Sequence, residues 1–379
     1  MIDIHTHLTK DITIDLVETL NNHYLVNEYI CTHLKSKASR DDFLNLSLVE
    51  RSQEIWNKMF IENKPISREA RAISKCIDSF GCNEYKNSIY DLTVFINNNK
   101  DLIYKIFSKK IFNEFNIKKI FMSNYALDGY SSDDIFTRVL RTDRRIHDYV
   151  NTSQRSSYGV NNLTPQMISI ATITNTEDTF DLFDIDGLRY VFKNLNYDTD
   201  TKKIPIHIFF GADRYINKKI KIYHQDLGEG IPVECSTKNL KQLLRLIRAF
   251  DDRPIFLSNM IESLEMEFIS IAKNYPNVIL CGFWWYMSSP ELIKKYLKIR
   301  IQELGYNFVP FFSDAKSLFQ MYYRWAEFEK IFETVLSEEG IMLFRDTSKP
   351  GHSLPAPMSF AEKMNLFMKH SVGDIFDGG

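Results

Sequence analysis

Cysteine is scarce in this chain of 379 residues, and its placement excludes two kinds of site. The five cysteines are scattered and form no CxxC pair, which argues against a disulfide framework and against a structural zinc knuckle. The sequence begins directly with Met-Ile-Asp-Ile-His, without the charged segment and apolar core of a signal peptide. We therefore expect a protein of the reducing cytoplasm.

Long apolar runs and an excess of one charge are missing as well. The longest apolar run, 278–287, is too short to cross a bilayer. A net charge of −2 offers no basic surface for nucleic acid or for an anionic membrane. The sequence contains neither a glycine-rich phosphate loop nor a nucleophile elbow. We therefore expect a small-molecule substrate, no nucleic acid and no membrane as partners, while a homo-oligomer is compatible with the sequence.

Apolar residues, in contrast, are plentiful. They make up 44% of the chain, with 28 Phe and 19 Tyr, which is typical of a globular protein with a large core. From residue 119 onward, short apolar runs alternate with helical patterns, which predicts a parallel sheet. Together with an apolar strand at 2–5, these runs make eight, which favours an α/β fold of the (β/α)8 TIM-barrel type. The predicted strands are 2–5, 119–122, 137–141, 168–173, 204–210, 254–258, 278–283 and 307–312. The predicted helices among the later strands and after them are 240–250, 261–274, 290–304, 315–336 and 360–369.

The stretch between the first two predicted strands has a different pattern. Its apolar residues recur at spacings of three and four, as in amphipathic helices, and Ser67 is expected to cap one of them. We interpret 12–117 as a helical subdomain inserted after the first strand. The whole chain, 1–379, is then a single barrel.

Two histidines stand at the end of the first predicted strand. Residues two apart in a strand point to the same side, so His5 and His7 project together from its carboxyl end. In a TIM barrel this end carries the active site, and two imidazoles with a nearby carboxylate suit a divalent metal. Two surface histidines would give the same local pattern, but the position after an apolar opening strand favours metal ligands.

A carboxylate follows the last predicted strand. Asp314 lies where strand 307–312 gives way to a helix, and on local grounds a helix N-cap explains it equally well. In a closed barrel the last strand lies beside the first, so this carboxylate can complete a His-His-Asp metal site and act as a base.

Three further segments carry candidate substrate contacts. His207 lies in an apolar strand, where a core histidine is the commoner interpretation, although a fourth metal ligand or a substrate contact stays open. Trp284 and Trp285 are adjacent at a strand exit, so we expect one indole to face inward as a wall for a sugar ring. Four arginines between 138 and 145 suit carboxylate or phosphate recognition, and a solvated basic loop would look the same.

The order of these motifs resembles that of the uronate isomerases, a divergent family of the amidohydrolase superfamily. The resemblance runs from residue 2 to the final helix. The segments that carry it, in collinear order, are IDIHTHL, NNHYLVNEY, RVLRTDR, PIHIFFGADR, CGFWWY, VPFFSDAKSLF and YYRWAEFEKIF.

This resemblance implies a role for each residue that matches a family motif. It implies that His5, His7 and Asp314 hold a divalent metal, with zinc as the expected ion. Asp314 or Tyr24 would serve as the base, and His207 as a further catalytic group. Lys316 stands where the family has an arginine. The residues that the resemblance assigns to substrate binding are His23, Tyr24, Arg144, Trp284, Trp285 and Lys316.

The expected function is therefore that of a metal-dependent aldose–ketose isomerase of hexuronates such as glucuronate or galacturonate. Two alternatives stay open. A metal-dependent hydrolase of the wider superfamily would cleave an amide or ester and would not interconvert aldose and ketose. A catalytically silent relative would bind a ligand or partner and hold no stoichiometric metal.

Overall fold

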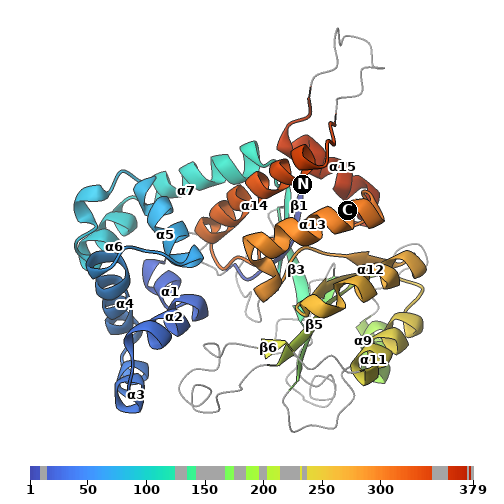
Figure 1. Ribbon diagram of the computed structural model, residues 1–379, viewed down its shortest axis with the longest axis horizontal. Coiled ribbons are helices and arrows are strands. Elements are labelled where there is room, and N and C mark those ends of the chain that lie inside the picture. The colour runs from blue at the N-terminus through green and yellow to red at the C-terminus, as the bar shows by residue number, and fades with distance from the viewer. Residues whose placement is uncertain are drawn as a thin grey trace.

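A parallel sheet surrounded by helices forms the centre of this computed structural model (Figure 1). The structure describes residues 1–8, 15–123, 135–141, 167–174, 185–195, 203–213, 231–232, 237–343, 357–373 and 375–376.

The main path of the sheet follows the order β1-β2-β3-β4-β5-β7-β8, and all neighbours along it are parallel. The strands are β1 (Ile2–Thr6), β2 (Lys119–Met122), β3 (Phe136–Arg141), β4 (Met167–Thr174), β5 (Ile206–Asp213), β6 (Ile231–Pro232), β7 (Ile255–Asn259) and β8 (Val278–Leu280). The short β6 pairs antiparallel with β5. Seven of the eight predicted strands are thus confirmed, because parallel strands covered on both faces have the continuous apolar sequences that identified them.

The prediction of an eighth strand at 307–312 is wrong. This segment forms one isolated parallel bridge, between Cys281 and Val309, and the Val309 N–H donates to the Leu280 carbonyl at 2.8 Å. Pro310 follows directly and has no N–H, so a regular ladder cannot continue through it. The described residues therefore form a mixed α/β fold with a parallel sheet, and they show no closed barrel of strands.

The chain beyond Pro310 nevertheless reaches the other edge of the sheet. The Asp314 N–H donates to the His5 carbonyl at 3.0 Å, and the His7 N–H donates to the Ala315 carbonyl at 2.7 Å. Backbone hydrogen bonds thus place the exit of β1 beside Asp314, as the sequence predicted.

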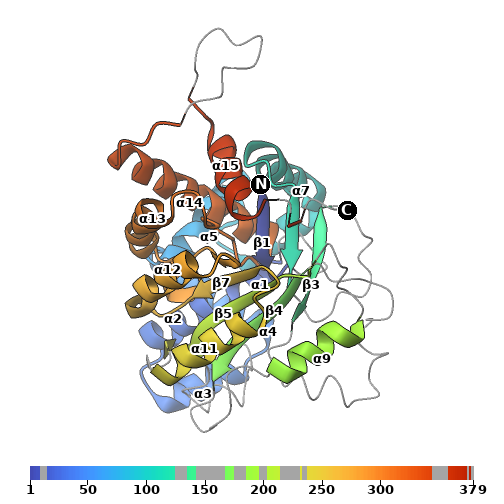
Figure 2. The same cartoon turned by 90° about the vertical axis from the view of Figure 1, so that its right-hand side faces the viewer.

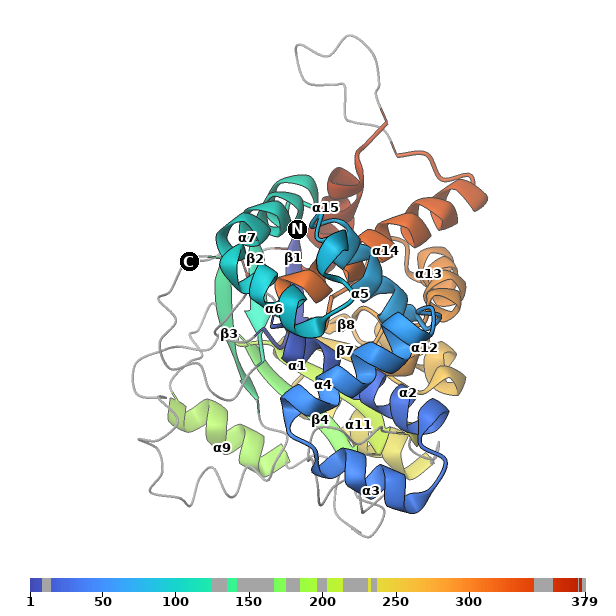
Figure 3. The same cartoon turned by 90° about the vertical axis from the view of Figure 1, so that its left-hand side faces the viewer.

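The chain between β1 and β2 is helical wherever it forms regular structure that is described. These helices lie together on one side of the molecule, at the left of Figure 1, and Figure 3 shows them in front of the strands. They are α1 (Leu16–Leu20), α2 (His23–His33), α3 (Lys37–Asn45), α4 (Leu48–Trp56), η1 (Asn57–Glu62), α5 (Arg68–Asp78), η2 (Asn83–Tyr85), α6 (Ile89–Asn98), α7 (Lys100–Ser108) and η3 (Lys109–Glu114). Ser67 caps α5 as predicted. The status of 12–117 as a separate subdomain stays a prediction.

Helices also accompany the later strands, and Figure 2 shows α11, α12 and α13 stacked along one side of them. These later helices are α9 (Ile185–Leu195), α11 (Thr237–Ala249), η6 (Glu262–Leu264), α12 (Glu265–Asn274), η7 (Trp285–Ser288), α13 (Pro290–Leu304), α14 (Leu318–Glu338) and α15 (Phe360–Ser371). The predicted helix 290–304 coincides with α13, whose start is fixed by a Ser289 cap followed by Pro290. Among the described helices, none combines the length and the apolar character needed to span a bilayer.

Candidate active site

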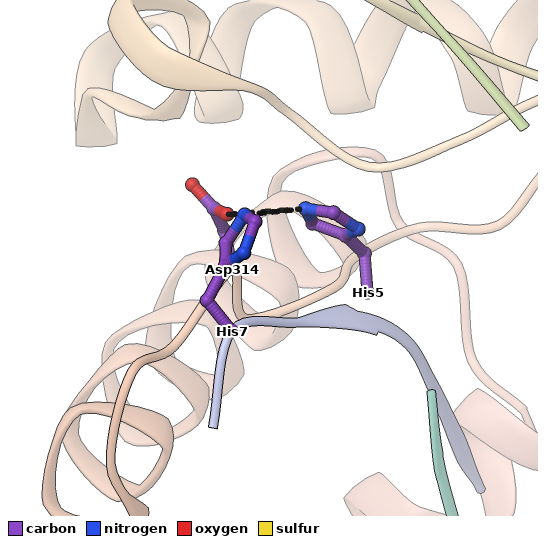
Figure 4. A group of neighbouring side chains, drawn as sticks. All are labelled: His5, His7 and Asp314. Carbon is purple, nitrogen blue, oxygen red and sulfur yellow. Dashed lines mark hydrogen bonds and ion pairs between the residues drawn. The ribbon is translucent and has the colours of Figure 1, made fainter. Parts of the chain in front are cut away.

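Three side chains meet at the exit of β1. His5 and His7 come from β1 and the residue after it, and Asp314 comes from the segment that precedes α14 (Figure 4). The Asp314 Oδ1 lies 3.3 Å from the His5 Nε2 and 3.4 Å from the His7 Nε2, and the two Nε2 atoms are 3.2 Å apart. The His5 side chain is 3% exposed, whereas His7 and Asp314 are 22% and 20% exposed, so the group opens toward solvent on one side.

The geometry of this triangle fits a divalent metal. Zinc binds imidazole nitrogen and carboxylate oxygen at about 2.0–2.1 Å, so two ligands at tetrahedral corners lie about 3.3–3.4 Å apart. The three measured separations, 3.2, 3.3 and 3.4 Å, agree with this tetrahedral edge. Two neutral imidazoles and a carboxylate are also a donor set that zinc prefers. Among the described residues, this is the group of histidine, cysteine and acidic side chains whose ligand atoms lie close enough for an ion.

Asp314 is held in an uncommon conformation. Its φ is 50°, in the left-handed region that aspartate tolerates better than most residues. Arg324 of α14 donates from one Nη1 to the carbonyls of Ser313 and Asp314, at 2.7 Å each, which fixes this turn. Burial alone would raise the pKa of Asp314, but the hydrogen bond from His5 and the charges of His7, His5 and Arg324 hold it well below its usual range. The side chain is therefore an ionised carboxylate at neutral pH.

Asp3 is a fully buried carboxylate that the sequence analysis missed as part of the site. It accepts from the Ser313 N–H at 3.1 Å and from the Trp325 indole N–H at 2.9 Å, so it ties β1 to the segment that carries Asp314. Burial raises the pKa of Asp3, and the hydrogen bonds from Ser313 and Trp325 oppose that rise. Its position two residues before His5, on the same face of β1, was the available signal.

Ser123 orients the deeper of the two imidazoles. Its hydroxyl lies 2.9 Å from the His5 Nδ1, at the exit of β2, and both groups are buried. A partner on Nδ1 fixes the ring and leaves Nε2 to face the triangle, which is the usual arrangement behind a metal-binding histidine. The serine that ends the apolar run IFMS was the signal for it in the sequence.

His207 lies beneath this group on β5. The side chain is fully buried, and its ring centroid is 5.7 Å from that of His5. Its Nε2 is 2.9 Å from the Ser258 hydroxyl, which itself donates to the Cys281 carbonyl at 3.0 Å. Because that serine proton is already used, the hydroxyl must accept from His207, so Nε2 carries the proton. Burial holds the pKa of His207 well below 6.5, and the neutral ring therefore has its lone pair on Nδ1, which is buried without a hydrogen-bond partner in this structure.

The structure places His207 outside the close-set group of three ligand atoms. It is thus a buried neighbour of the candidate metal site, as its interpretation as a core histidine predicted. Its catalytic role stays a prediction.

The expectation that one indole faces inward and the next outward is wrong. Trp284 and Trp285 are both buried, and their rings stack with centroids 5.3 Å apart. Strand alternation does not apply, because β8 ends at Leu280 and the chain then takes left-handed φ values at Gly282 (46°) and Trp285 (53°). A Cβ on Gly282 would lie 2.4 Å from the Phe312 ring, so only glycine fits this turn without displacing its neighbours.

Trp285 connects the sheet to the helical region. Its indole N–H donates to the His23 Nε2 at 3.1 Å, and the rings of His23 and Tyr24 lie 3.9 Å apart. The predicted substrate residues on α2 are thus brought to the turn after β8. Tyr24 also lies near Arg324. Burial would lower the pKa of that guanidinium, but the neighbouring Tyr323, Glu69, Tyr24 and Asp314 raise it.

The two predicted residues for binding a substrate carboxylate are placed differently. Lys316 is exposed and lies two residues after Asp314, and its backbone N–H donates to the Gln320 side chain at 2.8 Å. Arg144 lies outside the described residues, as do the other residues of the arginine-rich segment after Arg141.

Comparisons with known proteins agree with this picture. No family model matches the chain. A curated uronate isomerase from Brucella melitensis is 32% identical over 96 residues, which cover 24% of this chain and only 21% of that protein.

Solved structures match along nearly the whole chain. A uronate isomerase from Bacillus halodurans superposes with a TM-score of 0.71 at 19% identity, over 99% of this chain and 92% of that one. A glucuronate isomerase from Caulobacter crescentus gives a TM-score of 0.57 at 14% identity, over 99% and 90%. This chain therefore has the fold of the uronate isomerases, the family that its motifs resemble.

Proposed function

We propose that this protein is a metal-dependent aldose–ketose isomerase that converts a hexuronate, glucuronate or galacturonate, to the corresponding ketouronate. The observation that carries the proposal is the triangle of two imidazole nitrogens and one carboxylate oxygen at the exit of β1. The likeness to uronate isomerases over 99% of the chain supports the same assignment.

A divalent metal, with zinc as the expected ion, would be held by His5, His7 and Asp314. When bound, such an ion polarises the carbonyl and hydroxyl oxygens of a sugar. Ser123 and Asp3 orient the ligands from behind, and Arg324 fixes the turn that presents the carboxylate.

The side chains of this protein would bind the sugar and move a proton. A base, Asp314 or Tyr24, takes the proton from C2 of the aldose and returns it to C1 through an enediol, while the hydroxyl proton passes between O2 and O1. The ionised state of Asp314 at neutral pH suits it to this role. Lys316, with Arg144, would bind the sugar carboxylate through charge-assisted hydrogen bonds.

The substrate would lie between the metal triangle and α2. His23 and Tyr24 would cover the sugar from the helical side, Trp284 and Trp285 would line it, and His207 would support it from the sheet. We also propose that residues 308–315, which hydrogen bond to both β8 and β1, take the place of an eighth strand in a (β/α)8 barrel. A cytoplasmic location and a homo-oligomeric state stay predictions.

Incubation of zinc-loaded protein with D-glucuronate and with D-galacturonate tests the proposal. We expect the ketose from at least one of them, with none from chelator-treated protein and recovery after zinc is restored. No ketose from either sugar, with a full complement of metal present, would reject the isomerase. Cleavage of amide or ester substrates by the same preparation would point to the hydrolase instead.

A further inference from the structure

Two adjacent residues at the start of α5, Arg68 and Glu69, contact the elements that carry the predicted substrate-binding residues. Neither lies in one of the seven segments that resemble the uronate isomerases. Both lie in the helical region between β1 and β2, yet their partners include residues of η7 and α14, more than 200 positions later in the chain.

Arg68 faces the turn that contains Trp285. Its Nη1 donates to the Ser288 carbonyl at 2.6 Å, at the end of η7, and its Nε donates to the Glu327 carboxylate of α14 at 2.6 Å. The Ser288 hydroxyl in turn donates to the Trp285 carbonyl at 2.5 Å. The guanidinium therefore joins η7 to α14 through three of its N–H groups.

Glu69 faces the residues that flank the other two substrate-binding segments. Its carboxylate accepts from the Asn22 side chain at 3.2 Å and, at 3.5 Å, from the Gln320 side chain. Asn22 is the N-cap of α2, directly before His23, and its Oδ1 accepts from the Leu25 N–H at 3.0 Å.

Gln320 extends the same network toward the metal side. Its side-chain oxygen accepts from the backbone N–H of Lys316, two residues after Asp314. One carboxylate, Glu69, thus links the start of α2 to the start of α14.

We propose that Arg68 and Glu69 are positioning residues that hold α2, η7 and the start of α14 in register above the metal triangle. The proposal rests on the proposed isomerase function for its kinetic consequence. The ion pair of Arg68 with Glu327 is 29% and 32% exposed, so it contributes little to the stability of the fold. Small displacements of substrate-binding groups, in contrast, reduce turnover strongly. The pair should therefore affect substrate binding and turnover much more than folding.

The test compares Arg68→Ala and Glu69→Ala with two conservative variants, Arg68→Lys and Glu69→Gln. Glu69→Gln keeps an oxygen that accepts from Asn22, so it should recover most of what alanine loses. Glu62→Gln is the matched control, because Glu62 lies in the same helical region and pairs with Lys58 of η1. The measurements are zinc content, thermal unfolding, kcat and KM for D-glucuronate, and hydrogen exchange of the amides at 22–26, 285–289 and 316–320.

We expect both alanine variants to keep wild-type zinc content and melting behaviour while kcat/KM falls about 10- to 100-fold. The amides of the three segments should exchange faster in them and not in Glu62→Gln. Wild-type kinetics and exchange in both alanine variants would overturn the proposal, as would parallel loss of zinc, stability and activity. If the wild-type protein turns over no uronate, the proposed function fails, and the exchange data alone decide whether the two residues position these segments.

Discussion

The two sides of the candidate site are built differently. The metal side is formed by the exits of β1 and β2 and by the segment that follows β8. Backbone hydrogen bonds and the buried carboxylate of Asp3 hold these parts together. The substrate side is formed by α2. Side-chain contacts, such as that between Trp285 and His23, join this helix to the rest of the site. A substitution can remove a side-chain contact, whereas it leaves the backbone hydrogen bonds between segments in place. Changes on the metal side should therefore abolish the chemistry, whereas changes on the substrate side should alter affinity and specificity.

The largest effect is expected on the metal side itself. His5→Ala and Asp314→Asn each remove one ligand, so bound zinc and activity should fall by far more than the 10- to 100-fold typical of changes behind a metal ligand. Elemental analysis after gel filtration and the uronate assay measure both quantities. His370→Ala, which changes a histidine of α15 that stacks on Tyr306, is the control. Full zinc content in both ligand variants would exclude this site.

The second-largest effect is expected at a buried ion pair that contacts the turn before Trp284 and Trp285. Arg300 of α13 and Glu265 of α12 are each 1% exposed, their charged groups lie 2.6 Å apart, and Arg300 also donates to the Gly282 carbonyl at 2.7 Å. Arg300→Met leaves a buried carboxylate without its cation, which should cost about 3–5 kcal/mol of unfolding free energy. Denaturant titration measures this cost. Lys294→Met, which removes an exposed pair on the same helix, should cost about 1 kcal/mol or less; an equal cost for both would contradict the account.

Ser123→Ala probes the support behind the metal ligands. Loss of the hydroxyl partner of His5 should lower zinc affinity about 10- to 100-fold without displacing the other ligands. Competition with a chromogenic chelator gives the affinity. Ser371→Ala is a matched control, because Ser371 is also buried and donates to a backbone carbonyl, that of Phe367. Similar zinc affinity in the two variants would show that Ser123 plays no part in the site.

Trp285→Phe changes a contact on the substrate side of the site. An aromatic ring is kept, but the indole N–H that donates to His23 is lost. A half-buried acceptor left unsatisfied costs about 1–3 kcal/mol. We expect KM for the uronate to rise about tenfold while zinc affinity stays that of the wild type. Trp325→Phe should instead affect the metal side, because the Trp325 indole N–H donates to Asp3. A loss of zinc in Trp285→Phe would mean that the substrate side and the metal side do not act independently.

The last prediction is a pH dependence of stability through His207. Burial lowers the pKa of His207 in the folded protein, whereas the unfolded chain has the ordinary value of about 6.5. The unfolded state therefore binds one more proton below that pH. This contribution to stability is complete above about pH 6.5 and declines by up to about 1.4 kcal/mol per pH unit as the pH falls further. Denaturant titrations of chelator-treated protein at pH 7 and pH 5 should show a steeper decline in the wild type than in His207→Gln; equal slopes would mean that His207 is not buried as a neutral ring.

The sequence predicted the strand-based side of the site better than the helical side. His5 and His7 could be placed because period-two alternation and the exit of a strand both follow from local pattern. Asp314 was placed by the order of the strands, although its own segment is not a regular strand because of Pro310. The turn at Trp284 and Trp285 was mispredicted. Gly282 was a local signal for a left-handed φ, but nothing in the local sequence reveals one at Trp285.

The residues that the sequence did not identify act across long separations. Asp3 with Trp325, Glu69 with Gln320 and Arg68 with Ser288 are pairs that only the folded chain brings together. No role in the site could be assigned to any of them from its own segment. Such pairs are invisible to periodicity and spacing, which report what a residue does within one element.

Anomalous X-ray diffraction at the zinc edge, from crystals of zinc-loaded protein, tests the central claim most directly. We predict a single strong peak within bonding distance of the His5 Nε2, the His7 Nε2 and the Asp314 Oδ1. A peak bound by other residues, or none at this place in a preparation that contains one equivalent of zinc, would contradict it.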